Sequence, residues 1–171
     1  MDADSKGQLS IEAITAGYGH GFQVGDITFA ASPADIVGLI GPNGSGKSTL
    51  LKAIAGVLPV SRGRILFGGR PLREIAAHVA FVPQREEVNW EFPVTARDVV
   101  LMGRYRAAGW LRRPGAADRR SADAALERFG LGGMGHRHIS EFSGGQRQRI
   151  CIARALVQDP LVVLLDEPFT G

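Results

Sequence analysis

The 171-residue sequence contains one cysteine, no long hydrophobic run and little net charge, and each of these shortages excludes a class of protein. Because Cys151 is alone, no disulfide can form within the chain, which suits a reducing cytosol. No segment approaches the roughly 20 apolar residues of a membrane span, so we expect any membrane role to depend on a partner. The polar, acidic start of the chain is not the basic start followed by an apolar core that a secretory signal needs.

The net charge of +3 is too low for a protein dedicated to nucleic acid, because such proteins neutralise many phosphates. Arginines do gather between residues 104 and 120. A solvated face is the favoured interpretation, and contact with phospholipid headgroups or an acidic partner is the alternative. Hydrophobic residues make up 44% of the chain and charged residues 22%, as in a globular protein with a sizeable core. We expect one domain over residues 1–171, without internal repeats and with a helical insert at 90–140.

A glycine-rich segment, GPNGSGKST at residues 41–49, is the most informative part of the chain. It fits the phosphate-loop pattern Gly-x-x-x-x-Gly-Lys-Ser/Thr, in which glycines let backbone N–H groups turn toward phosphate oxygens. The lysine can reach the β- and γ-phosphates, the next hydroxyl can hold Mg²⁺, and the helix that begins there adds its positive dipole end. The candidate nucleotide-binding residues are Gly41, Pro42, Asn43, Gly44, Ser45, Gly46, Lys47, Ser48 and Thr49.

The segments on either side of this loop support the interpretation, because the pattern alone can also arise in an ordinary glycine-rich turn. Residues 36–40 (IVGLI) form a short apolar run that predicts a buried strand. Residues 49–58 have the spacing of an amphipathic helix, which Gly56 and Pro59 are expected to end. Strand, loop and helix in this order is the context that the motif requires.

The remaining pattern predicts an α/β protein with an antiparallel β region at its N-terminus. Strands are expected at 9–15, 24–31, 64–69 and 78–83, with turns at 32–35 and Pro71. Helices are expected after a Thr95 cap through 99–102, at 118–129, and from Ser143 to Asp159. The apolar run at 161–165 predicts the central strand of a parallel sheet that is covered on both faces.

Two acidic residues, Asp166 and Glu167, directly follow that run. In a nucleotide site the first can bind Mg²⁺ through water. The second can polarise the attacking water as a general base, a role worth about 10²–10⁴-fold in rate. An acidic pair that caps the next helix is the ordinary alternative, which the phosphate loop makes the weaker one.

A third motif, FSGGQRQR, occupies residues 142–149. Ser143 and Gln146 have the spacing of a capping box, in which each side chain bonds the backbone N–H of the other residue. The box predicts a helix start but does not explain Gly144 and Gly145, whose backbone N–H groups would be open to an anion. Two such helix starts, far apart in the sequence, suggest a nucleotide held between two surfaces.

Two further residues are candidates because of their positions. Gln84 follows the strand expected at 78–83, where a neutral amide is placed to touch Mg²⁺ or the attacking water; an ordinary loop residue is the alternative. Tyr18 precedes much of the β region and is placed to stack on a base, although a core or loop tyrosine fits the sequence equally well.

Taken in order, the loop at 41–49, Gln84, the Ser143–Gln146 signature and the strand before Asp166 resemble the ATP-binding subunit of an ABC transporter. The resemblance covers nearly the whole chain, and the signature is specific to that family. It implies a P-loop NTPase (ABC ATPase) core sheet with an N-terminal antiparallel β region and an inserted helical subdomain. No Asn-Lys-x-Asp guanine-reading motif is present in the sequence, which disfavours a GTPase.

The resemblance implies that ATP and Mg²⁺ are the cofactors. Tyr18 would stack on adenine, and Lys47 and Ser48 would bind the phosphates and Mg²⁺. The signature residues Ser143, Gly144, Gly145 and Gln146 would contact the γ-phosphate bound to the opposite protomer of a head-to-tail dimer.

The catalytic group is implied in the same way. Glu167 would act as the base, and Asp166 would support Mg²⁺. Gln84 would approach Mg²⁺, sense the γ-phosphate and relay its presence to membrane-spanning permease subunits. The chain would therefore be an ATPase at the cytoplasmic face of the cell membrane, served indirectly by an extracytoplasmic metal-binding protein and binding no nucleic acid.

A finer match lies in residues 82–105 (VPQREEVNWEFPVTARDVVLMGRY), which look like subunits of manganese, zinc or iron importers. Gln84, Arg85, Trp90, Phe92 and Pro93 carry it. Nothing in the chemistry of these residues selects a metal, and iron-chelate importers, which share part of DVVLMGRY, are the nearest alternative. Trp90 and Phe92 are expected to pack against a partner helix or, in the ordinary alternative, inside the helical insert.

The family pattern continues beyond the strand at 161–165, through an interface aspartate loop and a strand with a switch histidine. Both are missing here, since every histidine precedes that strand. We therefore expect the C-terminal part to be absent and hydrolysis by these 171 residues to be slow, which makes a nucleotide-binding fragment without catalysis an alternative. A soluble family member that acts on DNA or ribosomes is disfavoured, because these 171 residues contain neither a long coiled coil nor a second cassette; a second cassette downstream of them stays an open alternative.

Overall fold

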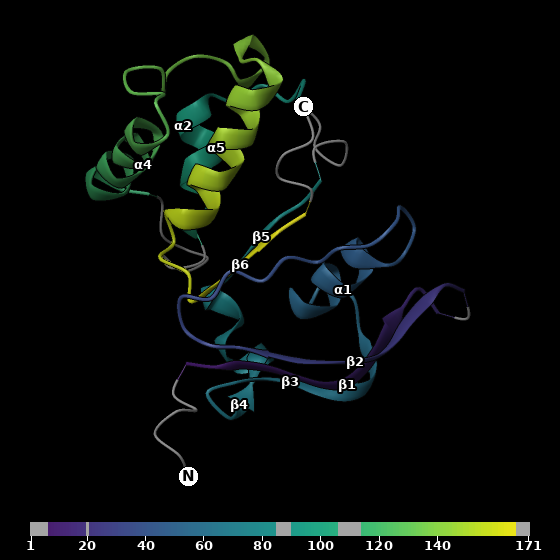
Figure 1. Ribbon diagram of the computed structural model, residues 1–171. Helices are drawn as coiled ribbons and strands as arrows, with labels where there is room; N and C mark the ends of the chain where they lie inside the picture. The colour runs from purple at the N-terminus through teal and green to yellow at the C-terminus, as the bar shows by residue number, and fades with distance from the viewer. Residues whose placement is uncertain (1–6, 20, 85–89, 106–113, 167–171) are drawn as a thin grey trace. The chain divides into compact units, whose positions relative to one another are not determined.

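The computed structural model describes residues 7–19, 21–84, 90–105 and 114–166, and contacts divide the chain into two compact units, Met1–Ala76 and Ala77–Gly171 (Figure 1). The first unit contains β1 (Leu9–Gly17), β2 (Gln23–Ala31), α1 (Lys47–Ile54), β3 (Val60–Phe67), β4 (Arg70–Pro71) and most of the 3₁₀ segment η2 (Leu72–His78). The second unit contains β5 (Val79–Val82), α2 (Ala96–Met102), α4 (Ala116–Arg128), the 3₁₀ turn η4 (Ile139–Glu141), α5 (Gly144–Leu156) and β6 (Val162–Leu165).

The first unit is built on an antiparallel sheet with the strand order β2-β1-β3-β4. This confirms the antiparallel N-terminal region and its strands at 9–15, 24–31 and 64–69. The burial of β1 changes phase, because Leu9 and Ile11 are buried before the shift in register and Ile14 and Ala16 after it. Ala13 forms the bulge with a φ of 45°, and a Cβ at the opposing Gly63 would overlap the carbonyl oxygens of residues 12 and 13.

Helix α1 packs against β1 and β2 of this sheet through Leu50, Ala53 and Ile54 (Figure 1). It begins at Lys47 and ends at Ile54, followed by Gly56 in a left-handed conformation with a φ of 73°. The predicted helix after the loop is therefore confirmed, and it ends where the glycine was expected to end it.

The strand expected at residues 36–40 is wrong. These residues have no regular structure; Ile36 is 100% exposed and Ile40 is 99% exposed. The apolar run satisfies the side-chain requirement of a buried strand, but a strand also needs a neighbour for its N–H and C=O groups. Within the described part of the chain, no strand pairs with this segment. The turn at 32–35 that precedes it is confirmed, since Ser32 N donates to the Asp35 carboxylate at 2.8 Å.

In the second unit, β5 and β6 form a parallel pair whose register runs from Val79 opposite Val162 to Val82 opposite Leu165. Helix α5 covers one face of the pair, where Cys151 and Ala155 pack against Ala80 and Val82. The strand expected at 161–165 is confirmed. Its cover on both faces is not confirmed, since Val163 is 38% exposed while its neighbour Leu164 is 7% exposed.

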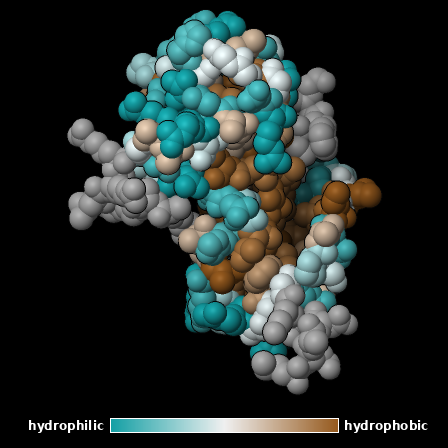
Figure 2. Space-filling model, turned by 90° about the vertical axis from the view of Figure 1, so that its left-hand side faces the viewer, coloured by the Kyte–Doolittle hydropathy of each residue, from teal (hydrophilic) through white to brown (hydrophobic). Residues whose placement is uncertain are grey.

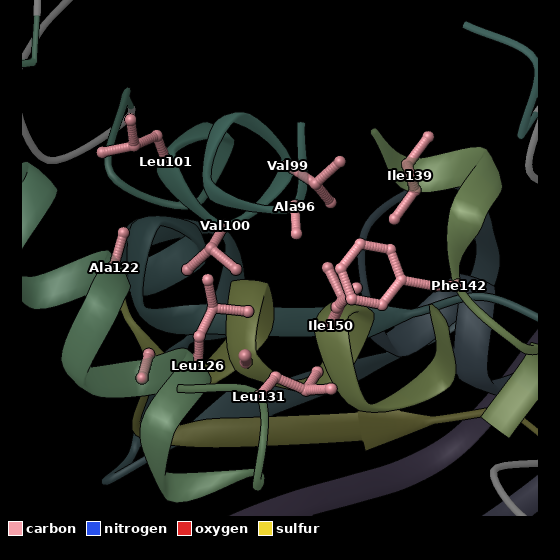
Figure 3. Close-up of a cluster of buried hydrophobic side chains, with 12 residues drawn as sticks. Ala96, Val99, Val100, Leu101, Ala122, Leu126, Leu131, Ile139, Phe142 and Ile150 are labelled. Atoms are coloured by element: carbon pink, nitrogen blue, oxygen red, sulfur yellow. The ribbon is translucent and has the colours of Figure 1, made fainter. Parts of the chain in front are cut away.

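Helices α2, α4 and α5 pack together around the larger apolar cluster of this unit (Figure 3). Val100 of α2, Leu126 of α4 and Ile150 of α5 point toward one another in that view, and each is at most 1% exposed. The predicted starts at Thr95 and Ser143 are confirmed by capping boxes at both positions. Helix α5 ends at Leu156, short of the predicted Asp159, because Asp159 already has a left-handed φ of 53° ahead of the proline.

The helical end of the second unit carries mostly hydrophilic side chains on the face shown at the top of Figure 2. No helix among the described residues combines the length and the apolar character that crossing a bilayer requires. The predicted helical insert at 90–140 lies within the second unit, and its status as a separate insert stays a prediction.

Candidate functional site

The phosphate-loop residues of the first unit lead directly into the N-terminus of α1. Gly46 is the N-cap residue, with a φ of 94° that a side chain would strain. A Cβ there would also overlap Val24 Cγ1 and crowd the ring of Phe22. The N-cap supplies no side-chain hydrogen bond, and the first turn contains no acidic residue. The start of α1 therefore turns its positive dipole end and its first N–H groups toward the loop without a cap of its own.

Lys47, the first residue of α1, folds its side chain back over the loop. Its Nζ donates to the carbonyl oxygens of Gly41 and Pro42, at 2.9 Å each. Ser45 N donates to Pro42 O at 3.2 Å and closes the turn beneath it. Thr49 is buried against the sheet, whereas residues 41–45 are exposed. The structure thus brings the predicted loop residues together. The positive side chain of Lys47 lies over the loop, and glycine occupies position 46, where the backbone packs against Val24 and Phe22.

The second unit places Gln84 and Asp166 after neighbouring parallel strands. Asp166 N donates to Val82 O at 3.0 Å, which extends the β5–β6 pairing by one step, and Gln84 lies two residues beyond Val82. Asp166 is buried, with only 2% of its surface exposed. A buried carboxylate at the carboxyl end of a parallel strand is where open α/β sheets bind ligands. Glu167, the predicted base, lies outside the described residues.

The signature residues form the start of α5. Ser143 N donates to the side-chain oxygen of Gln146 at 2.9 Å, and Gln146 N donates back to Ser143 Oγ at 3.4 Å. The predicted capping box is therefore confirmed. Space is open at Gly145, where an added Cβ would meet nothing within 4 Å. The contact of this segment with an anion stays a prediction.

Two other sequence interpretations are resolved by burial. Tyr18 lies at the end of the β1–β2 hairpin and is 57% exposed, so it is not a core residue. Cys151 is 4% exposed, and burial raises the pKa of its thiol, partly offset by the nearby charge of Arg154. A thiol with a raised pKa is a poor nucleophile at neutral pH, so Cys151 acts here as a small core residue.

Arg147, one turn into α5, was missed by the sequence analysis. Its guanidinium donates to the carbonyl oxygens of Ile139 and Ser140 and lies 5.5 Å from the ring centroid of Trp90. Arg149 likewise donates to Phe129 O at 3.0 Å. No sequence pattern predicts the contacts with Trp90 and Phe129, because these residues are distant in sequence from α5. The bonds to Ile139 and Ser140 are local, but the only signal for them was the pair of arginines after the signature.

Comparison with known proteins matches these features to one family. The sequence profile described as ABC transporter matches residues 24–170. The zinc transport system ATP-binding protein TroB of Treponema pallidum is 46% identical over 163 residues, which cover 95% of this chain and 61% of that protein. The manganese transport system ATP-binding protein MntA of Synechocystis is 45% identical over 170 residues, covering 98% of this chain and 65% of that protein.

The fold is matched as well. A solved structure described as an inward-facing conformation of a metal-chelate type ABC transporter superposes with a TM-score of 0.79 at 32% identity, covering 94% of this chain and 60% of that one. The chain thus spans somewhat less than two thirds of the length of these relatives. The phosphate loop leads into α1, the signature begins the capped helix α5, and the family profile matches nearly the whole chain. The chain therefore belongs to the ABC transporter family and has its P-loop ATPase fold.

Proposed function

We propose that this chain is the ATP-binding and ATP-hydrolysing subunit of a membrane importer for divalent metal ions such as manganese, zinc or iron. The observation that carries the nucleotide part is the uncapped start of α1 at Gly46, with Lys47 held at the loop. A helix start without a side-chain cap and a lysine at a glycine-rich turn are what a polyphosphate requires. The metal part rests on the zinc and manganese transport named for the relatives at 45–46% identity.

The nucleotide is held by residues 41–49, with the adenine on the exposed ring of Tyr18. Lys47 exchanges its bonds to the loop carbonyls for bonds to the β- and γ-phosphates. A second protomer, bound head to tail, presents the start of its α5 to the γ-phosphate, where Ser143, Gly144, Gly145 and Gln146 make the contact. Glu167 takes a proton from the attacking water, and hydrolysis separates the two protomers.

Mg²⁺ fits the donors that these residues offer. The Ser48 hydroxyl, the Gln84 amide oxygen and the Asp166 carboxylate are all hard oxygen ligands, and none is a thiol or an imidazole that would favour a softer metal. Asp166 is buried at a strand end beside the segment of Gln84, as a carboxylate must be to act on a bound ion rather than in bulk water. When bound, Mg²⁺ neutralises the charge that develops on the phosphates.

The partners follow from the assignment. Membrane-spanning permease subunits receive the conformational change through the segment after Gln84, at the cytoplasmic face of the membrane. An extracytoplasmic metal-binding protein acts on the same permease from the other side. The transported ion is chosen by these partners, since the described residues contain no cluster of three His, Cys, Asp or Glu side chains able to hold one.

The test is to titrate the purified chain with ATP and Mg²⁺ by calorimetry and to measure phosphate release from the same samples. We expect saturable binding that Lys47→Ala weakens, and release that Glu167→Gln abolishes while binding persists. Absence of saturable binding in the unaltered chain would overturn the proposal. Metal specificity is tested separately, by measuring uptake of ⁵⁴Mn, ⁶⁵Zn and ⁵⁵Fe in cells that carry the complete transporter with and without the Lys47→Ala change.

Two alternatives are decided by the same measurements. Uptake of a ferric chelate in preference to the free ions would favour an iron-chelate importer, as the metal-chelate type of the structural neighbour suggests. Binding without any phosphate release, and with no change on Glu167→Gln, would favour a nucleotide-binding module without catalysis.

A further inference from the structure

Among the described residues, a cation–π contact joins Trp90, which follows Gln84 in the sequence, to Arg147 in the first turn of α5. Trp90 lies six residues beyond Gln84, and Arg147 lies four residues beyond the N-cap residue Ser143. The guanidinium carbon of Arg147 is 5.5 Å from the centroid of the Trp90 ring, which is the geometry of a cation–π contact.

Arg147 also holds the chain that leads into its own helix. Its Nε donates to Ile139 O at 3.2 Å and its Nη2 donates to Ser140 O at 2.7 Å. These carbonyls belong to η4, the 3₁₀ turn directly ahead of the signature. One planar guanidinium therefore fixes η4, the first turn of α5 and an aromatic ring at once, which the compact ammonium of a lysine has no geometry to do.

Trp90 is itself anchored on two sides. It packs against the cluster of helices α2, α4 and α5, part of which Figure 3 shows around Ile139, Phe142 and Ile150. It also packs against the smaller cluster in which Cys151 of α5 meets Ala80 and Val82 of β5. The ring therefore packs against the end of β5, two residues before Gln84.

We propose that Arg147 is a positioning residue that holds the signature turn, Ser143 to Gln146, in register with the Gln84 segment through Trp90. This rests on the proposed ATPase function, in which both segments serve the γ-phosphate. A displacement of Gln84 is passed to the signature turn through the stacked ring, rather than being lost in a loose helix end. Arg147 touches neither nucleotide nor Mg²⁺.

The conservative change Arg147→Lys separates this role from a merely structural one. Lysine keeps the charge and the alkyl stem but loses the flat guanidinium face on Trp90, and its one nitrogen cannot occupy the positions of both Nε and Nη2 that bond Ile139 O and Ser140 O. If Arg147 positions the signature, kcat for ATP hydrolysis falls about tenfold while KM stays within about twofold, because binding at the phosphate loop is untouched. If it only stabilises the fold, the melting temperature falls and kcat per folded molecule does not change. Arg120→Lys, the same exchange at an exposed position on α4, is the matched control and leaves both unchanged.

Hydrogen exchange tests the anchoring without any turnover. In Arg147→Lys, the amides of residues 143–147 should exchange at least about threefold faster, while those of 150–155 keep their protection. Unchanged exchange at 143–147 would overturn the proposal, as would faster exchange with unchanged kcat. Failure of the unaltered chain to bind ATP would count against the proposed function alone, because the exchange comparison would still decide the anchoring.

Coupling through the ring is tested by a double-mutant cycle with Trp90→Phe, which keeps an aromatic surface and removes the indole. Adding Trp90→Phe to Arg147→Lys should lower kcat by at most about a further twofold, because both changes break the same contact. Fully multiplicative losses would show that the two residues act separately and would overturn the link through Trp90.

Discussion

The two glycine-rich helix starts of this chain, at α1 and α5, are capped in opposite ways. Helix α1 begins at Gly46 in a left-handed conformation, with no side-chain cap and no acid in its first turn. Helix α5 begins at Ser143 with an extended N-cap and a complete capping box to Gln146. Both starts leave glycines near the N-terminus, but the α5 cap bonds Gln146 N, whereas the α1 cap bonds none of the N–H groups of its helix.

The difference shows how similar sequences serve different tasks. An uncapped start is costly for a helix alone, and a polyphosphate can supply the missing acceptors. A capped helix start is stable without a ligand, so its surface is already formed when it meets a nucleotide bound to another protomer. Within the family assignment, this agrees with a chain that binds ATP at one helix start and offers the other to a second protomer.

The largest expected effect is at Gly46, where the open start depends on a missing side chain. Gly46→Ala would place a Cβ into Val24 at a φ of 94° and should lower the free energy of unfolding by about 2–5 kcal/mol. Gly44→Ala is the matched control, because its φ is 79° but nothing lies within 4 Å of the added carbon. It should cost only about 1–2 kcal/mol. Urea unfolding measures both, and equal losses would show that crowding against β2 is unimportant.

Next in size is the charge at the open start. Lys47→Ala removes the ammonium that lies over the carbonyls of Gly41 and Pro42 and should weaken ATP binding by about 10- to 100-fold, since hydrogen bonds to charged groups contribute about 1.5–3 kcal/mol. Calorimetric titration with ATP and Mg²⁺ measures it. Lys52→Ala, at the other end of α1, keeps the loop intact and should bind ATP normally. A small loss at Lys47 would mean that backbone N–H groups dominate the site.

These two helix starts also show what the sequence could specify. Capping depends on nearby residues, so the cap at Thr95 and the capping box at Ser143 could be predicted from the sequence, while the box partner Asp98 at the first of them was not predicted. The strand at 36–40 could not, because strand formation depends on a neighbour that periodicity does not identify. For the same reason the bulge at Ala13, opposite Gly63, and the contact of Arg147 with Trp90 were missed. The predictions that failed depended on contacts between segments distant in sequence, and those that were confirmed depended on nearby residues.

A smaller effect is expected at the capped start. Ser143→Ala removes the oxygen that accepts from Gln146 N and should cost about 1 kcal/mol of stability, the usual value of an N-cap. Ser143→Asp is the sharper comparison, because aspartate caps a helix equally well but repels a phosphate. We expect urea unfolding of the aspartate variant to match the unaltered chain, while its ATP hydrolysis falls. Normal hydrolysis by Ser143→Asp would contradict the role of the signature in contacting the γ-phosphate.

The smallest effect concerns acid and distinguishes the two starts once more. Glu141, just ahead of the capped start, accepts from the backbone N–H of His138 at 3.0 Å and from Arg137 Nε at 3.1 Å. The backbone hydrogen bond first, and then Arg137, hold the pKa of Glu141 below its ordinary value of 4.5. Because the folded pKa is the lower one, its stabilising contribution is complete above pH 4.5 and is lost as the pH falls through the folded pKa.

The open start has no acidic residue in its first turn and should show no matching titration of its own. Hydrogen exchange between pH 5.5 and about pH 3, corrected for the intrinsic rate, should therefore show residues 139–147 losing protection relative to residues 50–54 of α1, whose amides bond within the helix. Glu141→Gln should remove this difference, since the amide keeps an acceptor but does not titrate. The change should be slight, because Glu141 is largely exposed and water screens its ion pair. Equal loss at both helix starts would mean that acid acts on the fold as a whole and not on the cap.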